Sequence, residues 1–189
     1  MKNKEAEMKK IAVLFPGIGY HCDKPLLYYS RRLAQNAGYD IFPITYSFKK
    51  SGLKGDPEKM RKAAEELMKQ TEKALRDLSL EEYEDILFIS KSLGTAMAAR
   101  YAFEHDLDVR HILFTPLEQT FEYHLNNSIA FSGTADLWVD TEMIPKLCEE
   151  SDIPLTVIEG ADHSLETGDV LRNIDILKEV TEQVRNFIS

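Results

Sequence analysis

The segment ISKSLGT, residues 89–95, places the hydroxyl of Ser92 where an apolar strand would turn abruptly into an alanine-rich helix. Two small residues, Ser90 and Gly94, stand two positions before and two positions after it. A nucleophilic serine on such a bend needs small neighbours at these positions, because the strand-turn-helix geometry crowds the chain. The pattern is typical of a serine that attacks a carbonyl carbon. A serine that merely caps an ordinary helix fits the pentapeptide equally well.

A serine hydroxyl is a weak nucleophile unless a general base accepts its proton and a third group orients that base. Among the five histidines, His163 alone follows the last predicted strand, in EGADHSLE. That loop would reach the sheet edge at which Ser92 is expected, although a solvated loop histidine is the alternative interpretation. The acid is expected to be Asp136, just beyond an apolar run at 128–133. Asp140 is the second choice, because its position resembles the cap of the next helix.

A developing oxyanion needs hydrogen-bond donors, and the sequence offers one on each side of the predicted bend. The N–H of Leu93 would be one donor, since this residue opens the helix after the serine. The other is expected in LFPGIGY, where Gly17 and Gly19 permit close approach of the backbone to a ligand. The N–H of Ile18 is the preferred donor and that of Gly19 the second choice. A plain glycine-rich turn is the alternative, since the segment lacks the lysine of a phosphate-binding loop.

Predicted strands and helices alternate along the chain, which is typical of an α/β fold with a mostly parallel sheet and helices on both faces. Most of the predicted strands are nearly continuous apolar runs, as expected for strands that are buried on both faces. This pattern predicts about six strands. They are 10–15, 39–47, 85–90, 110–115, 128–133 and 154–160. The predicted helices are 26–38, a segment from Asp56 to Leu78, 93–104, part of 140–151, and Leu171 to Ile188.

Prolines and glycines mark the boundaries of these elements. Pro43 removes a hydrogen-bond donor from the second strand, which we therefore expect at an edge of the sheet or with a bulge. Asp56 and Pro57 are typical of a helix N-cap and a first helical position. The stretch 48–56 is the most loop-like part of the sequence.

Length, charge and cysteine content exclude several classes of protein. The 189 residues suit a single domain, 1–189, of which 1–9 are expected to be flexible. The net charge of −9 argues against nucleic acid or an anionic membrane as the main partner. Two cysteines, Cys22 and Cys148, provide neither a disulfide framework nor metal-site spacing. The charged N-terminus does not read as a signal peptide, and no run is long enough to span a membrane, so a cytoplasmic protein is expected.

Four segments, LFPGIGY, ISKSLGT, SGTADLWV and EGADHSLE, stand in this order along the chain. Together they resemble the α/β-hydrolase superfamily, and more narrowly its small lidless esterases of the dienelactone-hydrolase-like kind. The resemblance covers residues 10–188 and implies a minimal α/β-hydrolase fold. It implies a small-molecule ester or thioester substrate and neither a metal nor an organic cofactor.

The resemblance also implies a role for each candidate residue. Ser92 would attack the carbonyl carbon of an ester or thioester. His163 would take the serine proton and later return a proton to the leaving group, while Asp136 would hold the imidazole and stabilise its cation. The N–H groups of Ile18 and Leu93 would donate to the oxyanion.

Two positions depart from the usual pattern of this superfamily. Ser90 stands where glycine is usual, and Lys91 directly precedes the candidate nucleophile. We expect the Lys91 charge to point toward solvent; the alternatives are that it favours acidic substrates or disturbs His163. The stretch 116–127 is the one candidate cover over the site. The expected walls of a shallow pocket are Tyr20, His21, Leu117, Phe121 and Trp138.

The leading hypothesis from the sequence is a serine hydrolase that cleaves a carboxylic ester or thioester through an acyl-enzyme intermediate. Because a fold does not guarantee its chemistry, a non-catalytic binding protein of the same fold is one alternative. An acyltransferase that uses the same three side chains is the other.

Overall fold

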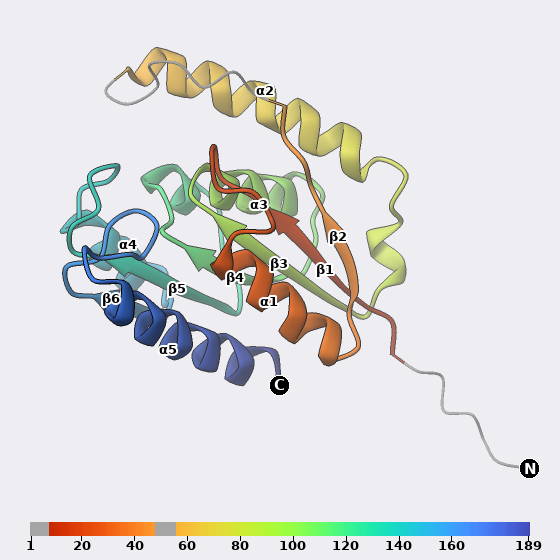
Figure 1. Ribbon diagram of the computed structural model, residues 1–189. Helices are drawn as coiled ribbons and strands as arrows, with labels where there is room; N and C mark the ends of the chain where they lie inside the picture. Colours follow the sequence, from red (N-terminus) through yellow and green to blue (C-terminus); the bar gives the residue numbers. More distant parts are fainter. Residues whose placement is uncertain (1–7, 48–55) are drawn as a thin grey trace, which may run out of the picture.

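The computed structural model describes residues 8–47 and 56–189 (Figure 1). Within these residues, parallel strands form one six-stranded sheet in the order β2-β1-β3-β4-β5-β6. The strands are β1 (Lys10–Phe15), β2 (Asp40–Pro43), β3 (Asp85–Lys91), β4 (Arg110–Phe114), β5 (Ser128–Gly133) and β6 (Leu155–Ile158). The parallel sheet predicted from the sequence is therefore confirmed.

Helices cover both faces of the sheet, as predicted (Figure 1). On one face lie α1 (Pro25–Asn36) and α5 (Val170–Ile188), which pack against each other. On the other face lie α2 (Pro57–Leu75), α3 (Leu93–Glu104) and α4 (Met143–Glu150). Two short 3₁₀ helices, η1 (Leu80–Glu82) and η2 (Glu118–Glu122), complete the described elements.

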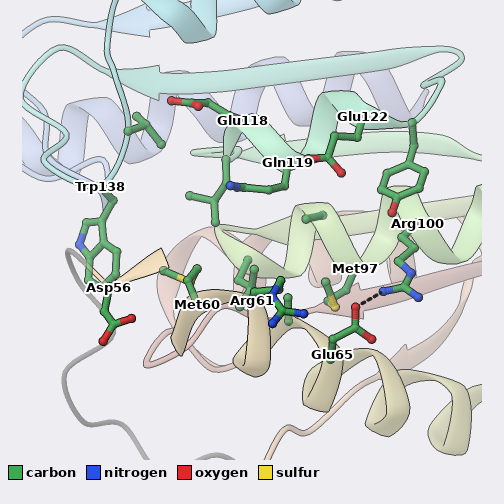
Figure 2. A pocket seen from close by; sticks show the side chains of 16 residues that line it. Asp56, Met60, Arg61, Glu65, Met97, Arg100, Glu118, Gln119, Glu122 and Trp138 are labelled. Carbon is green, nitrogen blue, oxygen red and sulfur yellow. Dashed lines mark hydrogen bonds and ion pairs between the residues drawn. The ribbon is translucent and has the colours of Figure 1, made fainter. Parts of the chain in front are cut away.

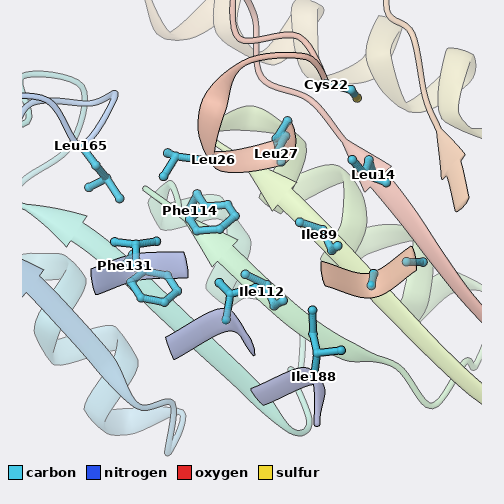
Figure 3. Packing of buried hydrophobic residues seen from close by; sticks show 14 of the residues in the cluster. Leu14, Cys22, Leu26, Leu27, Ile89, Ile112, Phe114, Phe131, Leu165 and Ile188 are labelled. Carbon is cyan, nitrogen blue, oxygen red and sulfur yellow. The ribbon is translucent and has the colours of Figure 1, made fainter. Parts of the chain in front are cut away.

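The central strands are mostly apolar because both of their faces are buried. Along β1, Ile11, Val13 and Phe15 belong to the cluster that packs against α2 and α3. The alternate residues, Ala12 and Leu14, belong to the cluster beneath α1 and α5, to which β3, β4 and β5 also contribute (Figure 3). Because both faces are buried, these strands appear in the sequence as nearly continuous apolar runs.

The predicted edge strand and helix cap are also confirmed. The strand that carries Pro43 is β2, at one edge of the sheet. The side chain of Asp56 accepts a hydrogen bond of 3.0 Å from the N–H of Lys59, and Pro57 is the first residue of α2. Of the predicted loop 48–56, only Asp56 lies within the described residues. Of the predicted flexible end, only residues 8 and 9 do.

The two edge strands are shorter than the sequence predicts. Only 40–43 of the predicted strand 39–47, and only 155–158 of 154–160, pair with a neighbour. Each edge strand pairs on one side only. Among the residues that the structure describes, no helix combines the length and apolar character needed to cross a bilayer.

Candidate active site

Ser92 occupies the bend between β3 and α3, as the sequence predicts. Its backbone has φ 54° and ψ −129°, a strained conformation for a residue with a side chain. The surroundings hold this conformation with three hydrogen bonds. The N–H of Ser92 donates to the carbonyl of Phe114 (3.0 Å), and its own carbonyl accepts from the N–H and the hydroxyl of Thr95 (2.8 and 2.6 Å).

The small residues on either side of Ser92 are required for different reasons. A Cβ atom at Gly94 would lie 2.4 Å from the carbonyl oxygen of Phe15, so α3 can approach β1 only because this residue is a glycine. Ser90 is fully buried, and its hydroxyl donates to the carbonyl of Ile112 at 3.1 Å. A serine is therefore tolerated where the superfamily usually has glycine, since its hydroxyl has an acceptor.

The structure brings together the three side chains predicted to act as nucleophile, base and acid. The Oγ of Ser92 lies 2.7 Å from Nε2 of His163, and Nδ1 of the same ring lies 2.6 Å from Oδ2 of Asp136. Asp136 is 3% exposed, and its Oδ1 accepts the N–H of Trp138 at 2.8 Å. Asp140, the second choice, instead accepts the N–H of Glu142 at 2.9 Å, just before α4. A proton can pass directly between the serine and the imidazole in this arrangement.

The imidazole of His163 is held in a largely desolvated position. The ring of Trp138 stacks on it with a centroid distance of 5.6 Å. Burial lowers the pKa of His163 below its usual value of 6.5, against the raising effect of the hydrogen bond with Asp136, and the charge of Lys91 lowers it further. His163 is therefore uncharged at neutral pH, which is the state in which it can accept a proton.

The predicted oxyanion donors border the bend. Gly17 and Tyr20 close a tight turn, in which the N–H of Gly17 donates to the carbonyl of Tyr20 (3.1 Å) and the reverse bond measures 3.2 Å. Neither bond uses the N–H groups of Ile18 and Gly19, the two central residues of the turn, and Gly19 adopts a φ of 87°. A Cβ at Gly17 would lie 3.0 Å from the Cβ of Ser92, so this turn lies directly against the bend.

The predicted orientation of Lys91 is wrong. The side chain is 1% exposed rather than solvated. Its Nζ donates to the hydroxyl of Thr115 (2.5 Å) and to the main-chain carbonyl of His163 (2.6 Å). It also lies 5.1 Å from the centre of the Tyr20 ring. The alternation along β3 could have indicated this, because Lys91 falls on the same face as Ile89, which is buried beneath α1 and α5.

Three other histidines lie away from the bend at Ser92. His111 is buried at the start of β4, the end of that strand opposite to the bend, and burial lowers its pKa to about 3. His105 stacks on Tyr101 and lies 2.9 Å from Glu72. His124 is exposed and follows η2.

A small cavity of about 230 Å³ opens over Ser92. Tyr20, Leu117 and Trp138 line it, as predicted, together with Ile18 and Leu93. The predictions for two further wall residues, His21 and Phe121, are wrong. The His21 side chain is exposed beside Asp23, and Phe121 packs against the core under α3 and α4.

A longer groove of about 630 Å³ continues from this cavity between α2, α3 and η2 (Figure 2). The two hollows share Met60, Leu93, Leu117 and Trp138. An ion pair of 3.2 Å between Arg100 and Glu65 joins α3 to α2 across the far part of the groove (Figure 2). The sequence does not indicate this groove, because the pattern of α2 shows an amphipathic helix but not the gap beside it.

Comparison with known proteins identifies the fold. No protein-family model matches the chain, and no curated protein matches its sequence. Among solved structures, Est1E from Butyrivibrio proteoclasticus with bound ferulic acid is 14% identical, with a TM-score of 0.68 over 99% of this chain and 91% of that one. The esterase Pf2001 from Pyrococcus furiosus is 17% identical, with a TM-score of 0.63 over 95% and 82%.

A third similar structure is an alpha-beta serine hydrolase homologue from Coxiella burnetii, 15% identical, with a TM-score of 0.60 over 94% of this chain and 87% of that one. At these identities the likeness concerns the path of the chain rather than a shared substrate. It agrees with the resemblance found in the four sequence segments. The chain therefore has the α/β-hydrolase fold, in a minimal form with a six-stranded parallel sheet.

Proposed function

We propose that the protein is a serine hydrolase that cleaves a carboxylic ester or thioester through an acyl-enzyme intermediate. The observation that carries this proposal is the unbroken chain of contacts from Ser92 through His163 to Asp136, at 2.7 and 2.6 Å. It begins at a strained bend on the carboxyl edge of a parallel sheet, where this fold places a nucleophile. The likeness to two esterases in fold supports the proposal.

In the first half of the reaction, the Oγ of Ser92 bonds to the carbonyl carbon while His163 Nε2 takes the hydroxyl proton. The carbonyl oxygen becomes an oxyanion, which the N–H groups of Ile18 and Leu93 would stabilise. The imidazolium is stabilised by the Asp136 carboxylate and gives its proton to the departing alcohol or thiol as the bond to that group breaks. Water then attacks the acyl-enzyme by the same route, which releases the acid and restores the serine.

The groove that continues from the cavity over Ser92 favours an ester substrate with an extended, uncharged group that would lie in the groove. Its volume lies in the usual range for small-molecule sites. Apolar side chains line the part next to Ser92, among them Met60, Leu93 and Leu117. Four carboxylates and two guanidinium groups line the groove, and its net negative charge disfavours an anionic substrate. These charged groups belong to Asp56, Glu65, Glu118, Glu122, Arg61 and Arg100.

Replacing Ala64 by phenylalanine tests this use of the groove. Ala64 lies on α2 and lines the groove but not the cavity around Ser92. A larger side chain there should lower kcat/KM for p-nitrophenyl octanoate by about tenfold, because the long acyl chain loses its apolar contacts. The acetate ester is the internal control and should be hydrolysed at the wild-type rate. An equal decrease for both esters would contradict the assignment of the groove.

Labelling with a fluorophosphonate tests the proposed chemistry without knowledge of the natural substrate. The probe should modify the tryptic peptide 92–100 at Ser92, because only an activated serine reacts readily. His163→Ala should slow labelling by at least about 10³-fold, since the serine loses its base. His124→Ala, which changes an exposed histidine outside the cavity, is the matched control and should label normally.

Each alternative function has a distinct result in this experiment. Absence of labelling in folded wild-type protein would contradict the proposal and favour a non-catalytic binding protein. Labelling combined with preferential transfer of the acyl group to an added alcohol or thiol, rather than to water, would favour an acyltransferase.

A further inference from the structure

Lys91 is a buried amine that the proposed reaction does not use. It is the last residue of β3, directly before Ser92, and it is 1% exposed. Burying an ammonium group is costly unless strong partners compensate for the lost water. The partners that the structure gives it are the Thr115 hydroxyl at 2.5 Å, the His163 carbonyl at 2.6 Å and the face of the Tyr20 ring.

Two hydrogen bonds converge on the main-chain carbonyl of His163. Its carbonyl accepts from Nζ of Lys91 and also from the hydroxyl of Thr115, at 3.2 Å. Thr115 directly follows the carboxyl end of β4 and has a φ of 42°, a strained conformation. The lysine, the threonine and the histidine come from three separate segments, so their contacts tie the loop after β6 to the centre of the sheet.

We propose that Lys91 is a positioning residue, which clamps the main chain of His163 and thereby sets the distance between the imidazole and Ser92. The inference rests on the proposed function, in which His163 is the general base. A displacement of about 1 Å in such a contact is sufficient to lower a rate by about 100-fold. The residue that immediately precedes Ser92 in the chain would thus fix the distance between the serine hydroxyl and the imidazole of its base.

The charges around Lys91 give it a second effect on His163. Burial lowers the pKa of Lys91 to about 7, while Asp136 and Asp162 act to raise it and Lys24 acts to lower it. Below that pH the ammonium is charged and lowers the pKa of His163, which burial also lowers and Asp136 raises. Removing the lysine charge should therefore move the titration of His163 to higher pH. A contact that carried no charge would leave that titration unchanged.

Lys91→Met is the first test, because methionine has a similar length but neither a charge nor a hydrogen-bond donor. The rate of fluorophosphonate labelling at pH 8 should fall about 10- to 100-fold. The midpoint of thermal unfolding should not fall, because the variant no longer buries an ammonium. Lys178→Met, the same change at an exposed position on α5, should label as wild type. Lys91→Gln retains a donor without charge and should label at an intermediate rate.

An NMR titration of the His163 imidazole tests the same inference without any reaction. In Lys91→Met and Lys91→Gln, His163 should titrate at higher pH than in wild type, and in Lys178→Met it should not shift. An unchanged titration together with an unchanged labelling rate would overturn the inference. So would a failure of both Lys91 variants to fold, which would assign the lysine a structural role alone. If wild-type protein is not labelled but the titration shifts, the proposed function fails while the link between Lys91 and His163 stands.

Discussion

Asp136→Asn is expected to reduce kcat for ester hydrolysis by about 10⁴-fold. The asparagine is nearly the same size and can still accept the N–H of Trp138, so the fold should tolerate it. An amide opposite Nδ1 of His163, however, either favours the wrong tautomer or leaves the imidazolium without a negative charge. In the wrong tautomer Nε2 carries a hydrogen and cannot accept the proton of Ser92. Steady-state kinetics with a p-nitrophenyl ester measure the effect.

Asp140→Asn is the matched control for this prediction. Asp140 is the other acid that the sequence offered, but it is exposed and accepts a main-chain N–H near the start of α4. Its replacement should leave kcat within about twofold of wild type, since surface changes away from special features are nearly neutral. A large loss in Asp140→Asn combined with normal activity in Asp136→Asn would mean that the wrong carboxylate has been assigned.

Gly94→Ala is expected to lower the free energy of unfolding by about 3 kcal/mol. Inside a helix this change normally stabilises by about 1 kcal/mol, so the prediction has the opposite sign to the general rule. The added Cβ would lie 2.4 Å from the carbonyl oxygen of Phe15 and 2.6 Å from that of Pro16. Both neighbours are backbone atoms, which cannot move aside as the end of a flexible side chain can. Urea denaturation measures the change.

Gly168→Ala provides the comparison, because an added Cβ at Gly168 meets no atom within 4 Å and its φ is not in the left-handed region. This variant should be as stable as wild type or more stable by about 0.5 kcal/mol. Since Phe15 and Pro16 lead into the turn at Gly17, Gly94→Ala should also slow labelling of Ser92. Equal stability of the two variants would show that α3 does not lie as close to β1 as the structure places it.

Most of the architecture was already determined by local patterns in the sequence. Nearly continuous apolar runs identify β1, β3, β4 and β5, because a strand covered on both faces has few polar positions. The sequence predicts Ser92, Asp136 and His163 as site residues because each follows a predicted strand. In a parallel sheet the carboxyl ends of the strands meet at one edge, so residues that are distant in the chain become neighbours.

The tertiary structure alone decided how the side chains at that edge are used. Lys91 reads as a surface residue from its charge, but it is buried because the loop carrying His163 and the Tyr20 ring close over it. Likewise, the path of the segment after β5 decides between the two acids. It brings the carboxylate of Asp136 to His163, whereas that of Asp140 accepts the N–H of Glu142. The groove beside Ser92 arises from the packing of α2 against α3, which periodicity does not encode. Patterns of spacing report which face of an element is buried, whereas contacts between loops depend on paths that no local pattern specifies.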